Sequence, residues 1–541
     1  MKKFFCFFQE EWVLVVLMST IIIFLNVFPD MRKLMQTPQN AVYQPIHNNH
    51  ADFAIYINYI RQGLEGKSTL TDRFTTEAHG GRLVNPYYLV LGRIGRVCSI
   101  TDPLFLYHTA RVTMSVVWIL VVYQYIHMTL SSKRARLSAF FFFLFSTSYP
   151  LIQKTPHGFS ITSYMFWWTE MDPLVRTTFL PAHTTGHILL LLTIMAFTPQ
   201  TKTTLRLFLF SLLGTVAGFI GGLFHTPSLI LPLIILPVWS LITRKWQRFL
   251  FISIGLSLSS LSFVILSRQF TVFPWTIAWE YEQKAFAIPF VEYILGFGPI
   301  VPLALLGIFV GNAKANNKIL WSLWTGFGLL VIPILSILQF VQIPFLQSLP
   351  LSNVRFLQIA LIVPLSLLSG TSILWIHKTL GNIATGIVLI ILTGNMIVTS
   401  FGSQAFTPLF KDPEFKYPST SWMQAVQSLH RQHASGAVLS LPFTGLSIGM
   451  YTNRTVYIAR YLATVDFERK LNLTWAFYTQ KMPLCTAFSF LTENHITEVF
   501  YGFDEKRAGG DSIKYPFLTL SYSYADTQIF TVQNQRPQEC R

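Results

Sequence analysis

The sequence predicts an α-helical polytopic membrane protein with a small α/β domain at its C-terminal end. The chain has 541 residues, of which 52% are hydrophobic and only 12% are charged, whereas a soluble globular chain carries about 25% charged residues. Apolar runs recur between residues 10 and 400, and about 20 apolar residues suffice to cross a bilayer. After residue 401 the sequence changes to short apolar strands alternating with polar helices. These observations separate a transmembrane domain (1–401) from a tail (402–541).

We expect about eleven membrane spans, each of them a helix of a transmembrane bundle. Their centres lie near residues 20, 120, 144, 190, 214, 235, 257, 300, 328, 364 and 390. The first run begins like a signal peptide. Glu10 and Glu11 interrupt it and no small-residue cleavage site follows, so we expect a retained first span. A long first outer loop (29–100) follows it.

The basic residues predict the orientation of the chain in the membrane. Thirteen Lys and Arg residues lie at the N-terminus and in the loops on the same side of the bundle, whereas the short opposite loops hold four. The positive-inside rule then places the N-terminus in the cytoplasm, and eleven spans place the tail outside. This bias, with attraction to anionic lipids, explains the net charge of +16. The sequence has no basic patch of the kind that would predict nucleic-acid binding. The expected location is a bacterial plasma membrane.

The tail is expected to fold as a small extracytoplasmic α/β domain, because its patterns alternate between helical and extended periods. The expected elements are a helix at 419–432, strands at 436–443 and 454–459, two helices within 463–496, and strands at 497–503 and 527–533. The four cysteines lie far apart without CxxC spacing. They predict neither a metal cage nor a dense disulfide framework.

A polar helix is expected early in the first outer loop, in "IHNNHADFAIYINYIRQGLEG" (46–66). Its apolar residues recur every three or four positions, which is typical of a helix lying in the membrane interface. The apolar stripe is Phe53, Ile57, Ile60 and Leu64, and the opposite side carries Asn58, Arg61 and Glu65. His50 and Asp52 lead this helix and would be held near the membrane surface.

This pattern is compatible with two roles for Asp52. Asn49 and Asp52 fit the N-cap and N3 positions of the helix, where a carboxylate interacts favourably with the helix dipole. A carboxylate kept at the bilayer surface is also suited to catalysis.

Further acidic and aromatic residues gather in the outer loops. Glu170 and Asp172 are two residues apart behind Trp167 and Trp168, and two such carboxylates can chelate a hard cation or hold a base beside one. The loop "FPWTIAWEYEQKAF" contributes Glu280, Glu282, Trp275 and Trp279. These tryptophans are suited either to stacking on sugar rings or to the aromatic belt of a membrane protein. His183 and His187 share one helix face, a spacing that is more common in packing than in metal sites.

Two arginines are expected near the outer ends of spans. Arg111 lies in the outer part of the second span and Arg355 at the outer end of the tenth. Snorkelling explains both positions, and so does recognition of a lipid phosphate, for which guanidinium is well suited.

Taken together, these features resemble the GT-C superfamily of integral-membrane glycosyltransferases. The resemblance rests on the many-span bundle, the early Asp52 in a long outer loop, the Glu170-x-Asp172 pair, Arg355 on a late span and the α/β tail. Members include the oligosaccharyltransferase catalytic subunit, protein O-mannosyltransferases and the aminoarabinose transferase of lipid A. No WWDYG motif opens the tail, which argues against an N-glycosylating oligosaccharyltransferase.

The resemblance implies sugar transfer from a polyprenyl-phosphate-linked donor to an acceptor hydroxyl of a glycan, lipid or protein. It implies catalytic or metal-binding roles for Asp52, Glu170 and Asp172, with Mg²⁺ or Mn²⁺ as the cation. The residues expected to bind substrate are His50, Arg111, Trp168, Glu280, Glu282 and Arg355.

Two alternatives belong to other functional classes. A lipid-linked saccharide transporter or flippase usually keeps ionisable residues in mid-membrane, where this sequence has almost none, and inverted repeats are not visible. A non-catalytic envelope-assembly protein would not need acids converging at the bilayer surface.

Overall fold

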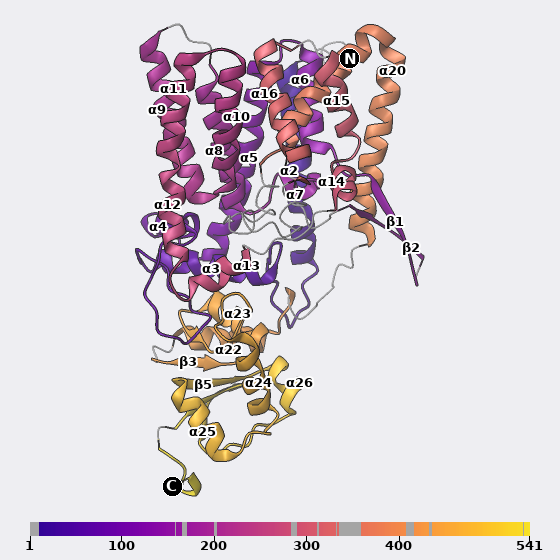
Figure 1. Ribbon diagram of the computed structural model, residues 1–541. Coiled ribbons are helices and arrows are strands. Elements are labelled where there is room, and N and C mark those ends of the chain that lie inside the picture. The colour runs from indigo at the N-terminus through magenta and orange to yellow at the C-terminus, as the bar shows by residue number, and fades with distance from the viewer. Residues whose placement is uncertain are drawn as a thin grey trace. The chain divides into compact units, whose positions relative to one another are not determined.

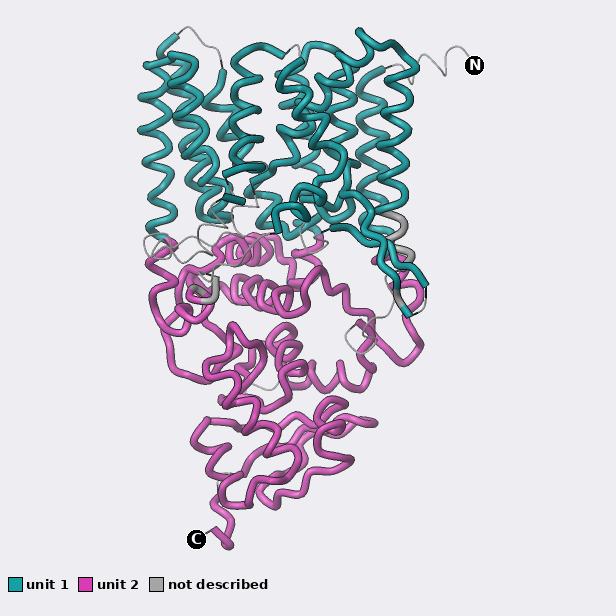
Figure 2. Tube along the Cα trace, turned by 45° about the vertical axis from the view of Figure 1, so that its right-hand side comes forward, with its two compact units in different colours: residues 1–29, 109–265, 283–409 teal, residues 30–108, 266–282, 410–541 magenta. Residues whose placement is uncertain are grey.

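The computed structural model describes residues 10–156, 158–164, 170–199, 203–282, 289–310, 313–331, 333–334, 359–406, 416–431, 435–533 and 535–540. The chain forms two compact units (Figure 2). Unit 1 comprises residues 1–29, 109–265 and 283–409, and unit 2 comprises residues 30–108, 266–282 and 410–541. The first outer loop and the tail thus belong to the same unit, and the predicted division after residue 401 lies close to the unit boundary after residue 409.

Unit 1 is a helical bundle whose long helices run side by side (Figure 1). The helices that contribute to it are α2 (Glu11–Met35), α5 (Pro103–Thr129), α6 (Lys133–Phe145), α7 (Pro173–Arg176), α8 (Pro181–Phe197), α9 (Thr204–Phe224), α10 (Pro227–Ile242), α11 (Trp246–Ser259), α12 (Leu261–Phe270), α14 (Phe290–Phe297), α15 (Ile300–Val310), α16 (Ala315–Gly326), the π-helical turn η1 (Phe327–Val331) and α20 (Ile362–Phe406). Strands β1 (Pro150–Thr155) and β2 (Gly158–Ser163) form an antiparallel hairpin.

Five described helical stretches are long and apolar enough to cross a membrane, and the α14–α15 pair, bent by 80°, would add a sixth. The five are Glu11–Met35, Pro103–Thr129, Thr204–Phe224, Trp246–Phe270 and Ile362–Thr399. Each of the expected span centres falls on a described helix, and Gly381 interrupts α20 between the last two centres. The chain is a multi-pass membrane protein, and the number of eleven spans stays a prediction.

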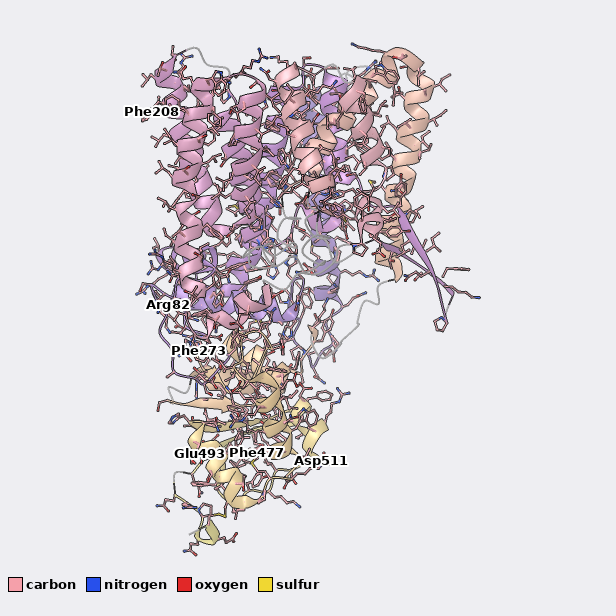
Figure 3. All side chains as sticks on the ribbon, in the orientation of Figure 1. Arg82, Phe208, Phe273, Phe477, Glu493 and Asp511 are labelled. Carbon is pink, nitrogen blue, oxygen red and sulfur yellow. A yellow bond between two sulfur atoms is a disulfide. The ribbon has the colours of Figure 1, made fainter. Side chains whose placement is uncertain are left out.

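Aromatic side chains pack in the core of unit 1. Trp321 donates its indole N–H to the hydroxyl of Tyr125 at 3.2 Å, and Trp324 donates to the carbonyl of Ile359 at 3.0 Å. Both tryptophans are fully buried, so each large ring is packed without losing a hydrogen bond. In contrast, Phe208 on α9 is half-exposed and points away from the neighbouring helices (Figure 3). Such a side chain suits a lipid-facing surface.

The first outer loop contributes two helices to unit 2, α3 (His50–Leu64) and α4 (Pro86–Val97), and α13 (Trp275–Glu282) comes from a later segment. Helices α3 and α4 approach closely at Gly63 and Gly92. A Cβ atom at Gly92 would lie 2.0 Å from the carbonyl oxygen of Ile60. Only glycine permits this backbone approach.

The tail contains a five-stranded sheet in the order β4-β3-β5-β7-β6. Strand β3 is parallel to β4 and β5, whereas β7 is antiparallel to β5 and β6. Its elements are α22 (Thr420–Arg431), β3 (Ala437–Leu439), α23 (Pro442–Tyr451), β4 (Thr455–Val456), α24 (Phe467–Tyr478), α25 (Leu484–Glu493), β5 (Ile496–Tyr501), α26 (Phe503–Gly509), β6 (Leu518–Tyr524), β7 (Thr527–Val532) and the 3₁₀ turn η2 (Gln538–Cys540). The strand expected at 436–443 is shorter, because Pro442 begins α23 at a position that favours a helix start.

One disulfide joins Cys485 on α25 to Cys540 in η2, across a sequence separation of 55 residues. This disulfide was not predicted, because two cysteines so far apart in the sequence carry no spacing signal. Disulfides persist in oxidising compartments, which agrees with the expected outer location of the tail.

Backbone hydrogen bonds join the first outer loop to the tail within unit 2. Val42 donates its N–H to the carbonyl of Pro418 at 3.0 Å, and Val456 donates to the carbonyl of Arg73 at 2.9 Å. Lys470 adds an ion pair to Glu77 at 2.7 Å. The two segments therefore fold together.

Helix α3 packs against α4 and α23 within unit 2, and its expected place in the membrane interface stays a prediction. On its polar side, Asn58 is fully buried and donates to the carbonyl of Gly449 in α23 at 2.6 Å, whereas Glu65 is exposed. The apolar residues Phe53, Ile57 and Ile60 are buried as well. The polar residues serve packing within unit 2, because buried amides need hydrogen-bond partners.

Candidate functional site

Asp52 lies in the first turn of α3. Asn49 is the N-cap, as predicted, and its side chain accepts a hydrogen bond from the N–H of Ala51 at 2.9 Å. Asp52 forms an ion pair with Arg460 of the tail, with Oδ1 2.5 Å from Nη1, and its side chain is 29% exposed. The carboxylate is thus held by an ion pair and remains partly exposed.

The first turns of α3 face residues that follow two parallel strands of the tail. The ring of His50 lies 5.3 Å from that of Phe443, in the helix that follows β3. Arg460 comes shortly after β4. Burial lowers the pKa of His50 to about 3, so this imidazole is neutral near pH 7.

A second, buried acid lies elsewhere in the first outer loop. Asp72 is 8% exposed, and its carboxylate accepts a hydrogen bond from the N–H of Phe74 at 2.8 Å. Burial raises the pKa of Asp72 to about 7, although the positive charges of Lys470 and Arg460 oppose the increase. The N–H of Asp72 donates to Nε2 of His79 at 2.9 Å. This acid is suited to exchange a proton near neutral pH.

In unit 1, Glu170 binds the N-terminal end of α20. One carboxylate oxygen accepts the N–H of Ala360 and the other that of Leu361, each at 2.7 Å. Only 2% of Glu170 is exposed. An anion at a helix N-terminus satisfies free N–H groups and interacts favourably with the helix dipole.

Arg176 fixes the loop that carries Glu170. Its guanidinium donates to the carbonyls of Glu170 at 2.7 Å, Phe143 at 2.7 Å and Ser146 at 2.6 Å. Phe143 lies near the end of α6, so Arg176 joins the loop to that helix. Together, Glu170 and Arg176 connect α6, the loop and α20.

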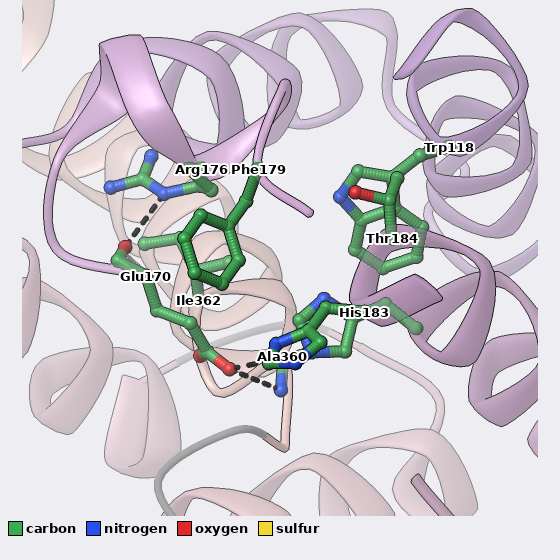
Figure 4. A pocket seen from close by; sticks show the side chains of 9 residues that line it. Trp118, Glu170, Arg176, Phe179, His183, Thr184, Ala360 and Ile362 are labelled. Atoms are coloured by element: carbon green, nitrogen blue, oxygen red, sulfur yellow. Dashed lines mark hydrogen bonds and ion pairs between the residues drawn. The ribbon is translucent and has the colours of Figure 1, made fainter. Parts of the chain in front are cut away.

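A small cavity of about 10 Å³ lies beside Glu170 (Figure 4), which is room for one water molecule. Trp118, Glu170, Arg176, Phe179, His183, Thr184, His187, Ala360 and Ile362 line it. Nε2 of His187 is 3.7 Å from the carboxylate of Glu170. The cavity is too small for a sugar.

Asp172 caps the short helix α7. Its carboxylate accepts the N–H of Leu174 at 2.8 Å, and burial raises its pKa. Glu170 and Asp172 therefore use their carboxylates on backbone N–H groups, which compete with a metal ion for the same oxygens. Within the described ranges, no group of three or more His, Cys, Asp and Glu residues is arranged to hold a metal ion. The carboxylate oxygens of Glu170 and Asp172 are thus already hydrogen-bonded, and the expected catalytic and metal-binding roles of these two acids stay predictions.

The other predicted site residues are distributed over both units. Arg111 is buried in α5 of unit 1, and Glu280 is exposed on α13 of unit 2. Glu282 ends α13, and its side chain lies outside the described part of the structure. Arg355 and Trp168 also fall outside the described residues.

Sequence reasoning missed Arg460 and Asp72. A usable signal existed for Arg460, since it follows the predicted strand at 454–459 and ligands often bind at the carboxyl ends of parallel strands. Asp72 had no such signal, because only burial distinguishes it from other loop carboxylates.

No protein-family model and no curated protein matches the sequence. Solved structures match along most of the chain. ArnT from Cupriavidus metallidurans bound to undecaprenyl phosphate has a TM-score of 0.54 at 12% identity, with 96% of this chain and 97% of that chain covered.

Two further proteins match with similar scores. The oligosaccharyltransferase AglB from Archaeoglobus fulgidus, in complex with an inhibitory peptide and a dolichol-phosphate, has a TM-score of 0.50 at 13% identity, covering 91% of this chain and 69% of that chain. The structure of this oligosaccharyltransferase with Zn and sulfate has a TM-score of 0.52 at 13% identity, covering 90% and 67%. The arabinofuranosyltransferase AftD from Mycobacteria has a TM-score of 0.50 at 11% identity and covers 96% of this chain but 41% of its own.

These matched proteins are GT-C glycosyltransferases. The likeness at this low identity concerns the fold, and it extends from the helical bundle into the tail because it covers 96% of the chain. The resemblance found in the sequence is thereby confirmed at the level of architecture: the chain has the GT-C fold of integral-membrane glycosyltransferases.

Proposed function

We propose that the protein is a membrane glycosyltransferase that moves a sugar from a polyprenyl-phosphate-linked donor to an acceptor hydroxyl. The main support is the likeness to ArnT bound to undecaprenyl phosphate, which covers nearly all of both chains. The position of Asp52 adds to it: a partly exposed carboxylate at the start of a helix in the first outer loop. The acceptor is a hydroxyl of a glycan, a lipid or a protein.

The proposed step is a displacement at the anomeric carbon of the sugar. The acceptor oxygen forms a bond to this carbon while the bond from the carbon to the phosphate oxygen breaks. The electron pair of the broken bond leaves with polyprenyl phosphate, and the acceptor proton passes to the carboxylate of Asp52. General base catalysis of this kind contributes about 10²–10⁴-fold in rate.

The proposed location is the bacterial plasma membrane, with the N-terminus in the cytoplasm and unit 2 outside. The positive-inside distribution of Lys and Arg supports this orientation, and so does the disulfide in the tail. In this orientation Asp52 would act at the outer surface of the bilayer, where lipid-linked donors present their head groups.

The proposal is tested with the full-length protein in nanodiscs. Undecaprenyl phosphate linked to glucose, mannose, N-acetylglucosamine or arabinose is supplied as donor, with native envelope extract as acceptor, and release of undecaprenyl phosphate is measured. Asp52→Asn should lower turnover by at least about 100-fold, because an amide cannot take the acceptor proton.

Asp102→Asn is the matched control. Asp102 is an exposed carboxylate of the same unit, and it accepts the backbone N–H of Leu104 at 2.9 Å. It should keep wild-type turnover. Near-normal turnover by Asp52→Asn would overturn the assignment of the base, and failure of the wild-type protein to consume any of the four donors would overturn the proposed donor class.

A further inference from the structure

We infer that Arg460 is a positioning residue of the transfer site, which makes the tail a part of that site. The inference rests on the proposed function, since it concerns how Asp52 is held for the reaction. Arg460 belongs to the tail and Asp52 to the first outer loop, more than 400 residues earlier in the sequence.

The contact itself is short and specific. Nη1 of Arg460 lies 2.5 Å from Oδ1 of Asp52, and the arginine side chain is only 20% exposed. A guanidinium at this distance binds the carboxylate through a charge-assisted hydrogen bond and fixes its direction. Asp52 is engaged through Oδ1, and the exposed part of its side chain remains open to the acceptor hydroxyl.

The backbone around Arg460 is firmly held, so the guanidinium has a defined position. Val456 donates its N–H to the carbonyl of Arg73 at 2.9 Å, and Thr464 donates its hydroxyl to the carbonyl of Phe74 at 2.7 Å. These two bonds flank Arg460 on either side in the sequence. The segment between them is thus fastened to the first outer loop, which carries Asp52.

The sheet of the tail explains why a charged residue is presented here. Strands β3 and β4 are parallel, so their carboxyl ends meet at one edge. Phe443 and Arg460 follow these ends and contact His50 and Asp52 in the first turn of α3. The carboxyl edge of parallel strands is a common position for functional groups.

A second ion pair on the same helix lies far from Asp52 and serves as a structural comparison. Arg73 binds Glu65 at the C-terminal end of α3 through two hydrogen bonds of 3.0 and 2.5 Å. Helix α3 has 15 residues, so the two pairs are separated by about 20 Å along its axis. Arg73→Gln is therefore the matched control for Arg460→Gln.

The first experiment does not depend on activity. A water-soluble carbodiimide with an amine trapping reagent modifies accessible carboxyl groups, and mass spectrometry of peptides measures the extent of modification at Asp52 at one fixed pH. In Arg460→Gln modification at Asp52 should increase by at least about twofold, because the carboxylate loses the guanidinium that binds Oδ1. Arg460→Lys keeps a cationic donor and should show a smaller increase, and Arg73→Gln should show none. Unchanged modification in Arg460→Gln would overturn the inference.

The second experiment is a double-mutant cycle on donor turnover. Arg460→Gln alone should lower turnover by about 100-fold, because small displacements of a reacting group can cost this much. In the Asp52→Asn background the same substitution should change turnover by less than about twofold, since residues that act as a unit are not additive. Independent, multiplying losses would overturn the inference.

The two proposals fail in different ways. An active wild-type protein whose Asp52→Asn variant is inactive, but whose Arg460→Gln variant is fully active, would keep the proposed function and overturn the role of Arg460. An Asp52→Asn variant with normal turnover would overturn the proposed base. In that case the extent of carbodiimide modification at Asp52 still tests whether Arg460 holds the carboxylate.

Discussion

Asp52 in unit 2 and Glu170 in unit 1 are both acids in predicted outer loops, but the structure holds them in different ways. Asp52 is paired with an arginine side chain and is 29% exposed. Glu170 is almost fully buried and gives both carboxylate oxygens to backbone N–H groups. A reactive acid needs access to substrate, whereas an acid that caps a helix needs only fixed N–H donors. Under the proposed function, the comparison favours Asp52 as the base, while Glu170 holds the start of α20 through hydrogen bonds.

The largest expected effect is a loss of stability that is confined to unit 2. Loss of the disulfide in Cys485→Ser/Cys540→Ser should lower the unfolding free energy of unit 2 by about 4 kcal/mol, given its separation of 55 residues. Unit 1 contains neither cysteine and should be unaffected. Limited proteolysis at increasing urea concentration, with cleavage sites mapped to each unit, measures both effects. Equal destabilisation of the two units would contradict the separation.

Glu505 in the tail is the counterpart of Glu170 within unit 2. Its carboxylate accepts the N–H groups of Leu441 at 2.8 Å and Gly502 at 3.1 Å, and burial raises its pKa from 4.5 to about 7. Between these values the folded state keeps a proton that the unfolded state has released, so stability should fall as pH rises from 4.5 to 7. The change is on the order of 3 kcal/mol.

Glu505→Gln removes this titration and should flatten the pH dependence of unit 2 over the same interval. Thermal unfolding followed at pH 4.5, 6 and 7.5 checks the slope. A wild-type stability that rises with pH would show that the hydrogen bonds to Leu441 and Gly502 outweigh burial.

Glu170→Gln should mainly reduce stability. The amide offers one acceptor oxygen, so one of the N–H groups of Ala360 and Leu361 loses its partner, at a cost of about 1–3 kcal/mol. Hydrogen exchange at the start of α20 should accelerate, while the turnover of the folded fraction stays near the wild-type value. A folded variant that has lost turnover by about 100-fold would instead place Glu170 in the chemistry.

The smallest expected effect concerns the N-cap of α3. Asn49→Ala removes the acceptor for the N–H of Ala51 and should destabilise the helix by about 1 kcal/mol. Turnover should fall only slightly, because Arg460 still holds Asp52. A large loss of turnover would mean that capping, rather than Arg460, positions the carboxylate.

Local signals were sufficient for much of the fold. Apolar runs placed the helices of the bundle, and Asn49 was predicted as an N-cap because capping depends on neighbouring residues. The strand β6 and the helix α23 were not predicted, although Leu518–Tyr524 alternates apolar or aromatic with polar residues and Pro442 is a favourable first residue of a helix.

The sites were harder to predict because they depend on contacts between distant segments. The partner of Asp52 lies in the tail, and no spacing rule relates the two positions. The Glu170-x-Asp172 pair looked like a chelating motif, yet its carboxylates bind backbone N–H groups. Short acidic motifs do not reveal whether their oxygens are already used.

The most direct test of the assignment is donor turnover per folded molecule in Asp52→Asn and Glu170→Gln, measured side by side in nanodiscs. Folded protein is quantified by monodisperse elution, so that stability and chemistry are separated. The account predicts a loss of at least about 100-fold in Asp52→Asn and near wild-type turnover in Glu170→Gln. The reverse result, an active Asp52→Asn and a folded but inactive Glu170→Gln, would contradict it.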